Sequence, residues 1–254
     1  KGDMAELTIA KRAARGPVYL LDLSQEVRES QLQGCSVTAV SSDPCAAIST
    51  DDEALDMADL LMETGAIGAG DTGGGGDAAF WKALARRRLA CFLRAGGWYP
   101  DPEQDGKLVW GGGVAWALNA CETVGPDAAA DTGGTHVVVE GLDEEAAEEL
   151  DDPETPTDLL TPNWSTTYLR VLLQGSRHAG SLLAAREMDQ RQRDSIGINC
   201  QVAMSAWAQD QVATGLQPFH PRMLQEPGAT LYIVSPSTGA GATPAALTLV
   251  QIVN

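Results

Sequence analysis

Two apolar segments, one near each end of the 254-residue chain, most strongly limit how it can fold. The first, GPVYLLDLS at residues 16–24, follows a Gly-Pro break, and the second, ATLYIVSP at 229–236, lies between Gly228 and Pro236. Continuous apolar runs of this length, bounded by Gly and Pro, are typical of strands buried on both faces in a parallel sheet. The chain between them is mostly helical in pattern, which predicts a helical insertion within an α/β domain.

Two segments in the middle of the chain predict strong helices. Apolar residues of DAAFWKALARRRLACFLRAGG, which starts at Asp77, share one broad helical face, and apolar residues recur at helical spacing from Ile196 to Trp207. We expect these two helices to pack together with Trp81 and Trp207 largely buried, because unpacked stripes of this length would leave an exposed patch. Residues 23–50 read as irregular. Further helices are expected at residues 4–14, 51–64, 109–121, 166–174, 179–188 and 245–253.

The net charge of −18 is concentrated in two segments. Residues 43–77 hold nine acidic residues and residues 140–159 hold ten, and neither segment contains Lys or Arg. The other 16 acidic residues are balanced by 17 basic ones. This partition argues against indiscriminate coating of DNA and favours a basic protein as partner. The simpler alternative is that the acidic segments only keep the protein in solution.

The cysteines and the apolar runs indicate where the chain is found. The five cysteines are odd in number and form no C-x-x-C pair, so a zinc site is not predicted and reduced thiols in a cytosol are expected. No apolar run approaches the ~18 residues of a membrane-spanning helix. The first residues have neither an initiator Met nor the apolar core of a signal peptide, which predicts a chain cut from a longer protein.

Motifs for catalysis are weak. Asp22 ends the first apolar segment, where a nucleotide hydrolase can hold Mg²⁺, but the phosphate-binding pattern G-x-x-x-x-G-K-[ST] is absent from the chain. Asp-Thr-Gly-Gly occurs at 71–74 and at 131–134, without the preceding apolar strands of an aspartic protease. No G-x-S-x-G elbow is present either. A Cys–His or Ser–His–Asp site, whose members can be far apart in sequence, is left open.

Arginines of the two strong helical segments are candidate binding residues. Arg88 falls inside the apolar face of its helix, Arg87 and Arg94 lie towards its edges, and Arg191 and Arg193 lie in the polar stretch DQRQRDS. The simpler interpretation is that Arg88 lays its stem on apolar surface and that DQRQRDS is a solvated helix start. The acidic candidates for contact with a partner are Glu144, Glu145, Glu148 and Glu149.

Several segments, taken in order, resemble coupling proteins of the TraG/TraD type, which serve conjugation and type IV secretion. KGDMAELTIAKRAARGPVYLLDLS resembles the segment after the P-loop helix of that family through Lys1, Asp3, Gly16–Pro17 and Asp22, although Leu23 replaces the usual Pro. DAAFWKALARRRLACFLRAGG and RQRDSIGINCQVAMSAWAQDQVATG resemble helices of the family's inserted all-α domain. ATLYIVSP resembles the strand that returns the chain to the motor domain.

The resemblance implies a fold and a function. The fold would be mainly α, with an all-α substrate-recognition domain at residues 51–215 inserted into a partial RecA-like α/β domain made of residues 1–50 and 216–254. The parent protein would be a membrane-anchored, hexameric P-loop ATPase on the cytoplasmic side of the inner membrane. ATP and Mg²⁺ would be bound outside this chain, which would itself hold no cofactor and no catalytic residue. Asp22 would then end a strand that does not bind Mg²⁺.

The implied partners are a relaxase or a secreted protein as substrate and the components of the secretion channel, with DNA contacted indirectly. Two alternatives stay open: a stand-alone helical protein-interaction module without a motor, and an unrecognised hydrolase. A P-loop just before Lys1 in the full reading frame would distinguish the coupling ATPase from both.

Overall fold

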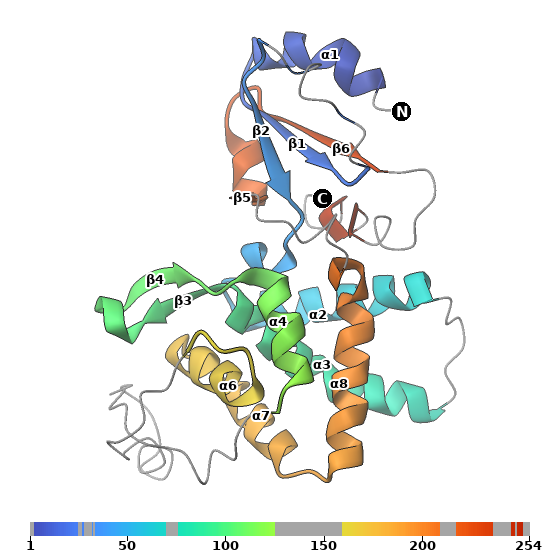
Figure 1. The fold of residues 1–254 in the computed structure, drawn as a ribbon, viewed down its shortest axis with the longest axis vertical. Coiled ribbons are helices and arrows are strands. Elements are labelled where there is room, and N and C mark those ends of the chain that lie inside the picture. Colours follow the sequence, from blue (N-terminus) through green and yellow to red (C-terminus); the bar gives the residue numbers. More distant parts are fainter. Residues whose placement is uncertain are drawn as a thin grey trace.

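In the computed structural model the chain forms a parallel sheet unit and a larger helical unit, stacked one on the other (Figure 1). The structure describes residues 3–24, 27, 32, 34–69, 76–124, 159–208, 217–235, 245–246 and 248–250. The sheet unit is built from both ends of the chain and the helical unit from its middle.

Among the described residues the sheet has four parallel strands in the order β5–β2–β1–β6. They comprise β1 (Val18–Asp22), β2 (Val37–Ser41), β5 (Gln217–Pro218) and β6 (Thr230–Val234). The two apolar segments of the sequence are therefore neighbouring strands, with Val18 opposite Thr230 and Asp22 opposite Val234. This confirms that both are strands of one parallel sheet.

The helix α1 (Asp3–Ala13) packs against β1. Ile9 of this helix is buried, and so are the first four residues of β1. A central strand of a parallel sheet is covered on both faces, which explains why β1 carries a continuous apolar run rather than alternating residues.

The helical unit is the connection between β2 and β5. Neighbouring parallel strands need a crossover, and here the crossover is enlarged into several helices whose buried residues form one continuous core with those of the sheet. The helix α3 contacts α2, α4, α6 and α8, and its Leu89, Phe92 and Leu93 are fully buried. The helices of this unit are α2 (Asp51–Ala69), α3 (Gly76–Gly96), α4 (Gly113–Glu122), α6 (Trp164–Leu173), α7 (Ala179–Arg186) and α8 (Gln190–Met204). Short 3₁₀ helices are η2 (Pro44–Ala47), η3 (Pro102–Gln104), η4 (Ser205–Ala208) and η5 (Pro221–Gln225).

A β-hairpin projects from one side of the helical unit (Figure 1). It consists of β3 (Trp98–Asp101) and β4 (Lys107–Trp110), which pair antiparallel. The turn between them contains η3 and then Asp105, whose φ of 54° is left-handed. Asp is one of the residues that tolerate this conformation, and Gly106 follows with a φ of 73°.

The predicted fold class, a mainly α chain with an all-α domain inserted into a partial RecA-like domain, was wrong. The chain is α/β, because a sheet with four described parallel strands is present and the β3–β4 hairpin lies inside residues 51–215. The apolar pattern of residues 109–121 suggested one helix, but Gly111 and Gly112 separate strand residues from a helix that begins only at Gly113. The short strand β2, VTAVS, lies in the segment read as irregular.

The two strong helices of the sequence pack against each other as α3 and α8, which confirms their predicted pairing. Trp207 is buried, as expected, and its indole N–H donates to the carbonyl oxygen of Ser42 at the end of the sheet unit. Trp81 is only partly buried and lies edge-on to the exposed Phe80.

Across the part of the chain that the structure describes, no helix combines the length and the apolar character needed to cross a membrane.

Candidate functional site

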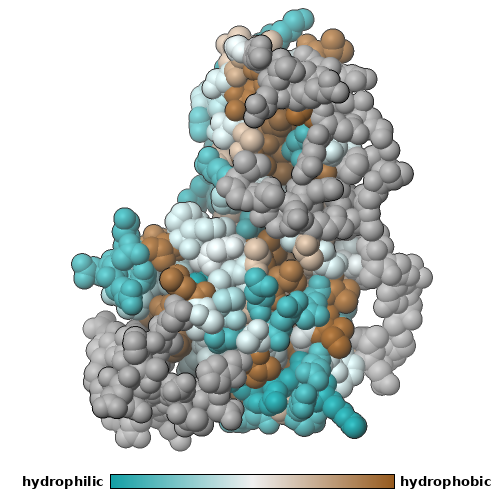
Figure 2. Space-filling model, in the orientation of Figure 1, coloured by the Kyte–Doolittle hydropathy of each residue, from teal (hydrophilic) through white to brown (hydrophobic). Residues whose placement is uncertain are grey.

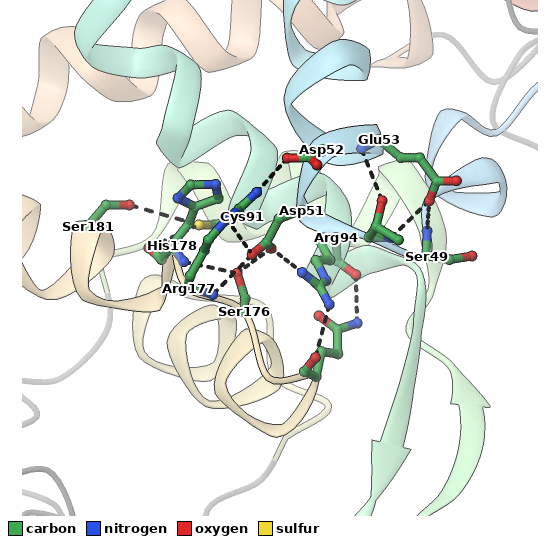
Figure 3. Close-up of polar contacts among 12 residues, drawn as sticks. Ser49, Asp51, Asp52, Glu53, Cys91, Arg94, Ser176, Arg177, His178 and Ser181 are labelled. Carbon is green, nitrogen blue, oxygen red and sulfur yellow. Dashed lines mark hydrogen bonds and ion pairs between the residues drawn. The ribbon is translucent and has the colours of Figure 1, made fainter. Parts of the chain in front are cut away.

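The most developed polar cluster surrounds Asp51, the first residue of α2 (Figure 3). Its Oδ1 accepts a hydrogen bond from the Ser176 hydroxyl at 2.6 Å, and its Oδ2 accepts one from the backbone N–H of Arg177 at 3.0 Å. Arg94 of α3 forms an ion pair with the same carboxylate. An anion at this place is favourable because the first turn of a helix presents unpaired N–H groups. The cluster ties α2, α3 and the loop between α6 and α7 together.

The contacts of the Asp51 carboxylate stabilise the structure. Burial favours its protonated form, but the hydrogen bonds from Ser176 and Arg177 and the charge of Arg94 outweigh this effect, so the pKa of Asp51 is lowered. Gln174 extends the cluster by donating to the carbonyl oxygens of Arg94 and Trp98 at 2.9 and 2.8 Å. The arrangement stabilises the joint between helices.

Cys91 and His178 lie beside this cluster, but their geometry does not form a nucleophilic site (Figure 3). The Cys91 thiol is directed at the backbone oxygen of His178, at 3.5 Å, and lies 3.9 Å from the Ser181 hydroxyl. Burial raises the pKa of Cys91 to about 12, so its thiolate is scarce near neutral pH. The Ser176 hydroxyl donates directly to Asp51, whereas a serine triad places an imidazole between these two groups. This cluster therefore gives no support to the hydrolase alternative.

Arg170 of α6 is the most deeply buried charged side chain among the described residues, with 1% exposure. Its Nη1 donates to the carbonyl oxygens of Ala95 and Gly111 at 2.9 and 2.6 Å, and its Nε donates to that of Leu159 at 2.9 Å. These oxygens belong to the last turn of α3, the link between β4 and α4, and the segment before α6. One side chain thus joins three parts of the helical unit.

The same guanidinium lies over two aromatic rings. Its central carbon lies 4.3 Å from the centroid of Tyr99 and 3.9 Å from that of Trp116. Gly111 must be glycine here, because a Cβ atom would lie 2.8 Å from Arg170 Nη1 and 2.6 Å from the oxygen of Ala95. Arg170 was not predicted as an important residue, because its only signal in the sequence was an arginine within the apolar stretch YLRVLL.

Asp43 joins the sheet unit to the helical unit. It follows β2, and its carboxylate accepts hydrogen bonds from the N–H groups of Cys45, at 2.9 Å, and of Val114 in α4, at 3.1 Å. Gly113 has a φ of 69°, and a Cβ atom there would lie 1.9 Å from the Asp43 carboxylate. Burial raises the pKa of Asp43. The carboxyl end of β2 is therefore fixed to the start of α4.

The Asp22 carboxylate accepts hydrogen bonds from the turn that follows β1. Its Oδ1 accepts hydrogen bonds from the Ser24 N–H and hydroxyl at 3.0 and 2.6 Å, and its Oδ2 accepts one from the Val27 N–H at 2.8 Å. Within the described ranges, no three His, Cys, Asp or Glu side chains gather as metal ligands would. The geometry of Asp22 is that of a strand end closed by a turn.

Two of the arginines singled out in α3 make internal contacts. Arg88 is buried, and its guanidinium donates to the carbonyl oxygens of Leu84 and Ser181 at 2.8 and 3.2 Å. Burial lowers the pKa of Arg88. Arg94 is the ion-pair partner of Asp51. Both side chains contribute to the packing of the helical unit.

The other three candidates differ in exposure. Arg193 donates to the carbonyl oxygens of Arg186 and Met188, both at 2.8 Å, and so closes the α7–α8 turn. Arg87 and Arg191 are exposed. Contact of these arginines with a partner stays a prediction.

The four glutamates proposed as partner contacts, Glu144, Glu145, Glu148 and Glu149, lie outside the described residues. Their role also stays a prediction.

Comparisons of the chain with models of protein families, with curated proteins and with solved structures found no match. Its function is therefore inferred from its own residues and from the resemblance of its sequence segments.

Replacing Arg170 with Lys should lower the free energy of unfolding by about 2 kcal/mol or more, because a compact ammonium group lacks the planar fork that reaches three separate carbonyl oxygens while lying over two rings. Urea unfolding followed by circular dichroism measures the change. The matched control is Arg87→Lys on the exposed side of α3, which should shift the free energy by less than about 0.5 kcal/mol. Equal stability of the two variants would contradict the role of Arg170.

The pKa of Asp51 is lower in the folded than in the unfolded chain, so its ionised form stabilises the fold. This contribution is complete above the unfolded-state pKa, near 3.8, and is lost as the pH falls through the lower folded-state value. The difference in urea midpoint between the wild type and Asp51→Asn should be largest near about pH 6 and shrink towards about pH 3.

The neighbouring Asp52→Asn is the control for this titration. Asp52 pairs with Arg177 at an exposed position, so its replacement should change the midpoint little at any pH. A difference for Asp51→Asn that stays constant across the titration would show that ionisation of Asp51 does not stabilise the fold.

Proposed function

We propose that this chain is the substrate-receiving part of a coupling ATPase of conjugation or type IV secretion. It would recruit a relaxase attached to DNA, or a secreted protein, to the secretion channel. The observation that carries the proposal is the position of the helical unit, which is inserted into the crossover between the neighbouring parallel strands β2 and β5. Such an insertion adds a separate binding surface to a nucleotide-driven sheet, as the resemblance to TraG/TraD-type proteins implies.

The chemistry of ATP hydrolysis would belong to other parts of the parent protein. The chain contains no G-x-x-x-x-G-K-[ST] pattern, and the Asp22 carboxylate is engaged by Ser24 and Val27. We therefore assign ATP and Mg²⁺ to residues of the parent outside this chain. The part described here would bind and position a substrate.

The flank of β6 supports a larger parent protein. Among the described strands β6 pairs only with β1, and its residues 230–233 are only partly buried. An open hollow beside it is lined by Leu224, Leu231 and Ile233 among others, and Figure 2 shows hydrophobic atoms in this upper unit. Parallel sheets are normally covered on both faces. We propose that other elements of the ATPase cover this flank.

The charge of the chain favours a protein as the directly bound substrate. The two base-free segments hold 19 of the 35 acidic residues, and this field opposes contact with the phosphates of a naked duplex. Four of the described arginines, Arg88, Arg94, Arg170 and Arg193, bind internal carbonyl oxygens or Asp51. A basic protein surface suits the acidic segments, because complementary charge speeds association and rejects polyanions.

On the basis of the resemblance we also propose a location for the parent protein in the cell. The parent would be anchored in the inner membrane and assemble as a hexamer, with this chain on the cytoplasmic side and in contact with the secretion channel.

A stand-alone helical interaction module is the second candidate. It is favoured by the extensive buried interior of the helical unit, in which Phe92 packs edge-on against the buried Trp164 at a centroid distance of 5.6 Å. The full reading frame separates the two candidates, because only the coupling ATPase has a P-loop.

The proposed function predicts that acidic residues attract the protein substrate. The probe is the relaxase encoded by the same genetic element, immobilised for surface plasmon resonance. Changing Glu144 and Glu145 to Gln, or Glu148 and Glu149 to Gln, should slow association and make binding less sensitive to salt, because long-range attraction is lost.

The matched control is the double variant Glu122→Gln and Asp194→Asn, which removes two exposed charges outside both base-free segments. It should slow association less than either acidic pair. Equal effects of the three variants, or tight binding of naked duplex DNA at physiological salt, would contradict the proposed function.

A further inference from the structure

The outer face of the β3–β4 hairpin carries only apolar side chains. Trp98 lies opposite Trp110, and Pro100 lies opposite Leu108. Because successive residues of a strand point to opposite faces, these four side chains share one face, which we call the outer hairpin face. The other face includes Tyr99, which is buried and stacks on Arg170.

The outer hairpin face is open to solvent. Trp98 is 48% exposed and Leu108 is 59% exposed, while Pro100 and Trp110 are partly buried. The rings of Trp98 and Trp110 lie 5.4 Å apart at a tilt of 58°. Figure 2 shows hydrophobic atoms next to hydrophilic ones on the projecting hairpin. Exposed aromatic clusters of this kind are typical of protein-binding surfaces, where Trp contributes strongly to affinity.

The hairpin is held rigidly at its base. Gln174 donates to the carbonyl oxygen of Trp98 at 2.8 Å, and the N–H of Gly111 donates to the oxygen of Gly97 at 2.8 Å. The Arg170 guanidinium lies over the Tyr99 ring, and it donates a hydrogen bond to the carbonyl oxygen of Gly111. A preorganised surface loses little conformational entropy on binding, which favours affinity.

The tip of the hairpin is mainly acidic, which favours a basic partner. The tip carries Asp101, Glu103 and Asp105 against a single Lys107. Asp101 caps η3, accepting from the N–H of Glu103 at 3.0 Å, while the side chains of Glu103 and Asp105 are exposed. Cations are attracted both to carboxylates and to the faces of Trp rings.

We propose that the outer hairpin face binds a basic, apolar segment of the protein substrate, in which Arg or Lys alternates with residues such as Leu. Apolar side chains of the segment pack on Trp98, Leu108 and Trp110, and its cations pair with Glu103 and Asp105. This proposal rests on the proposed function for the identity of the partner. It adds the chemical character of the substrate segment that the hairpin binds.

The direct test uses a fluorescein-labelled synthetic peptide of alternating Arg and Leu, with binding to the whole chain followed by anisotropy. The double variant Trp98→Ser and Leu108→Ser should bind about tenfold more weakly, because two exposed anchors are lost. Ile198→Ser is the matched control, since Ile198 is 57% exposed on α8 and lies outside the hairpin. Similar binding by wild type and double variant, or an equal loss in Ile198→Ser, would overturn the proposal.

A second pair of variants tests the charge. Glu103→Gln with Asp105→Asn should weaken binding about threefold and reduce its salt dependence. The control Asp56→Asn with Glu63→Gln removes the same charge from exposed positions of α2 and should leave binding nearly unchanged. A peptide of alternating Glu and Leu should not bind. Equal binding of that peptide, or equal losses in the two charge variants, would overturn the proposed selectivity.

The relaxase of the same genetic element separates this proposal from the proposed function. Weaker binding of the relaxase to the Trp98→Ser and Leu108→Ser variant supports both. Unchanged binding of the relaxase overturns the hairpin proposal and leaves the proposed function standing. Failure of the relaxase to bind the wild-type chain, while the Arg-Leu peptide binds at the hairpin, counts against the proposed function and supports the chemistry of the hairpin.

Discussion

The buried guanidinium of Arg170 is the interaction on which the arrangement of the helical unit most depends. A charged group is stable in a protein interior only when polar partners replace water around it. Arg170 finds these partners in the carbonyl oxygens of Ala95, Gly111 and Leu159. The oxygen of Ala95 lies in the last turn of α3, and the last carbonyl groups of a helix have no hydrogen-bond partner within that helix. Through Arg170, α6 therefore fixes the relative positions of the end of α3, the base of the hairpin and the start of α4.

Two aspartates fix the other joints, and they differ in how they respond to pH. Asp51 has Arg94 beside it, so its ionised form is favoured in the folded protein. Asp43 is partly buried and bonded to backbone N–H groups, and this burial raises its pKa. Lowering the pH removes stabilisation at Asp51 and relieves the cost of a buried charge at Asp43. The contact between α2 and α3 is thus the joint that acid should weaken first.

How much the sequence predicts depends on the length of each pattern. The long apolar stripes of α3 and α8 predicted their packing, and the continuous apolar runs predicted β1 and β6, which are neighbours in the sheet. The strand β2 and those of the hairpin are about as short as β1 and β6 but lack their continuous apolar runs, so they show no clear pattern and the fold class was mispredicted. The role of Arg170 could not be predicted, since its carbonyl partners lie 11 to 75 residues away in the chain.

The helical unit, rather than the sheet unit, is the surface that we expect to receive a protein. Lysines are few in this chain, and two exposed ones mark the two units: Lys107 lies in the hairpin and Lys11 in α1. Crosslinking of the chain to the relaxase of the same genetic element with an amine-reactive reagent, followed by mass spectrometry, tests this expectation directly. We predict crosslinks from Lys107 and few from Lys11. Crosslinks that come from Lys11, with Lys107 left free, would contradict a helical unit that receives the substrate.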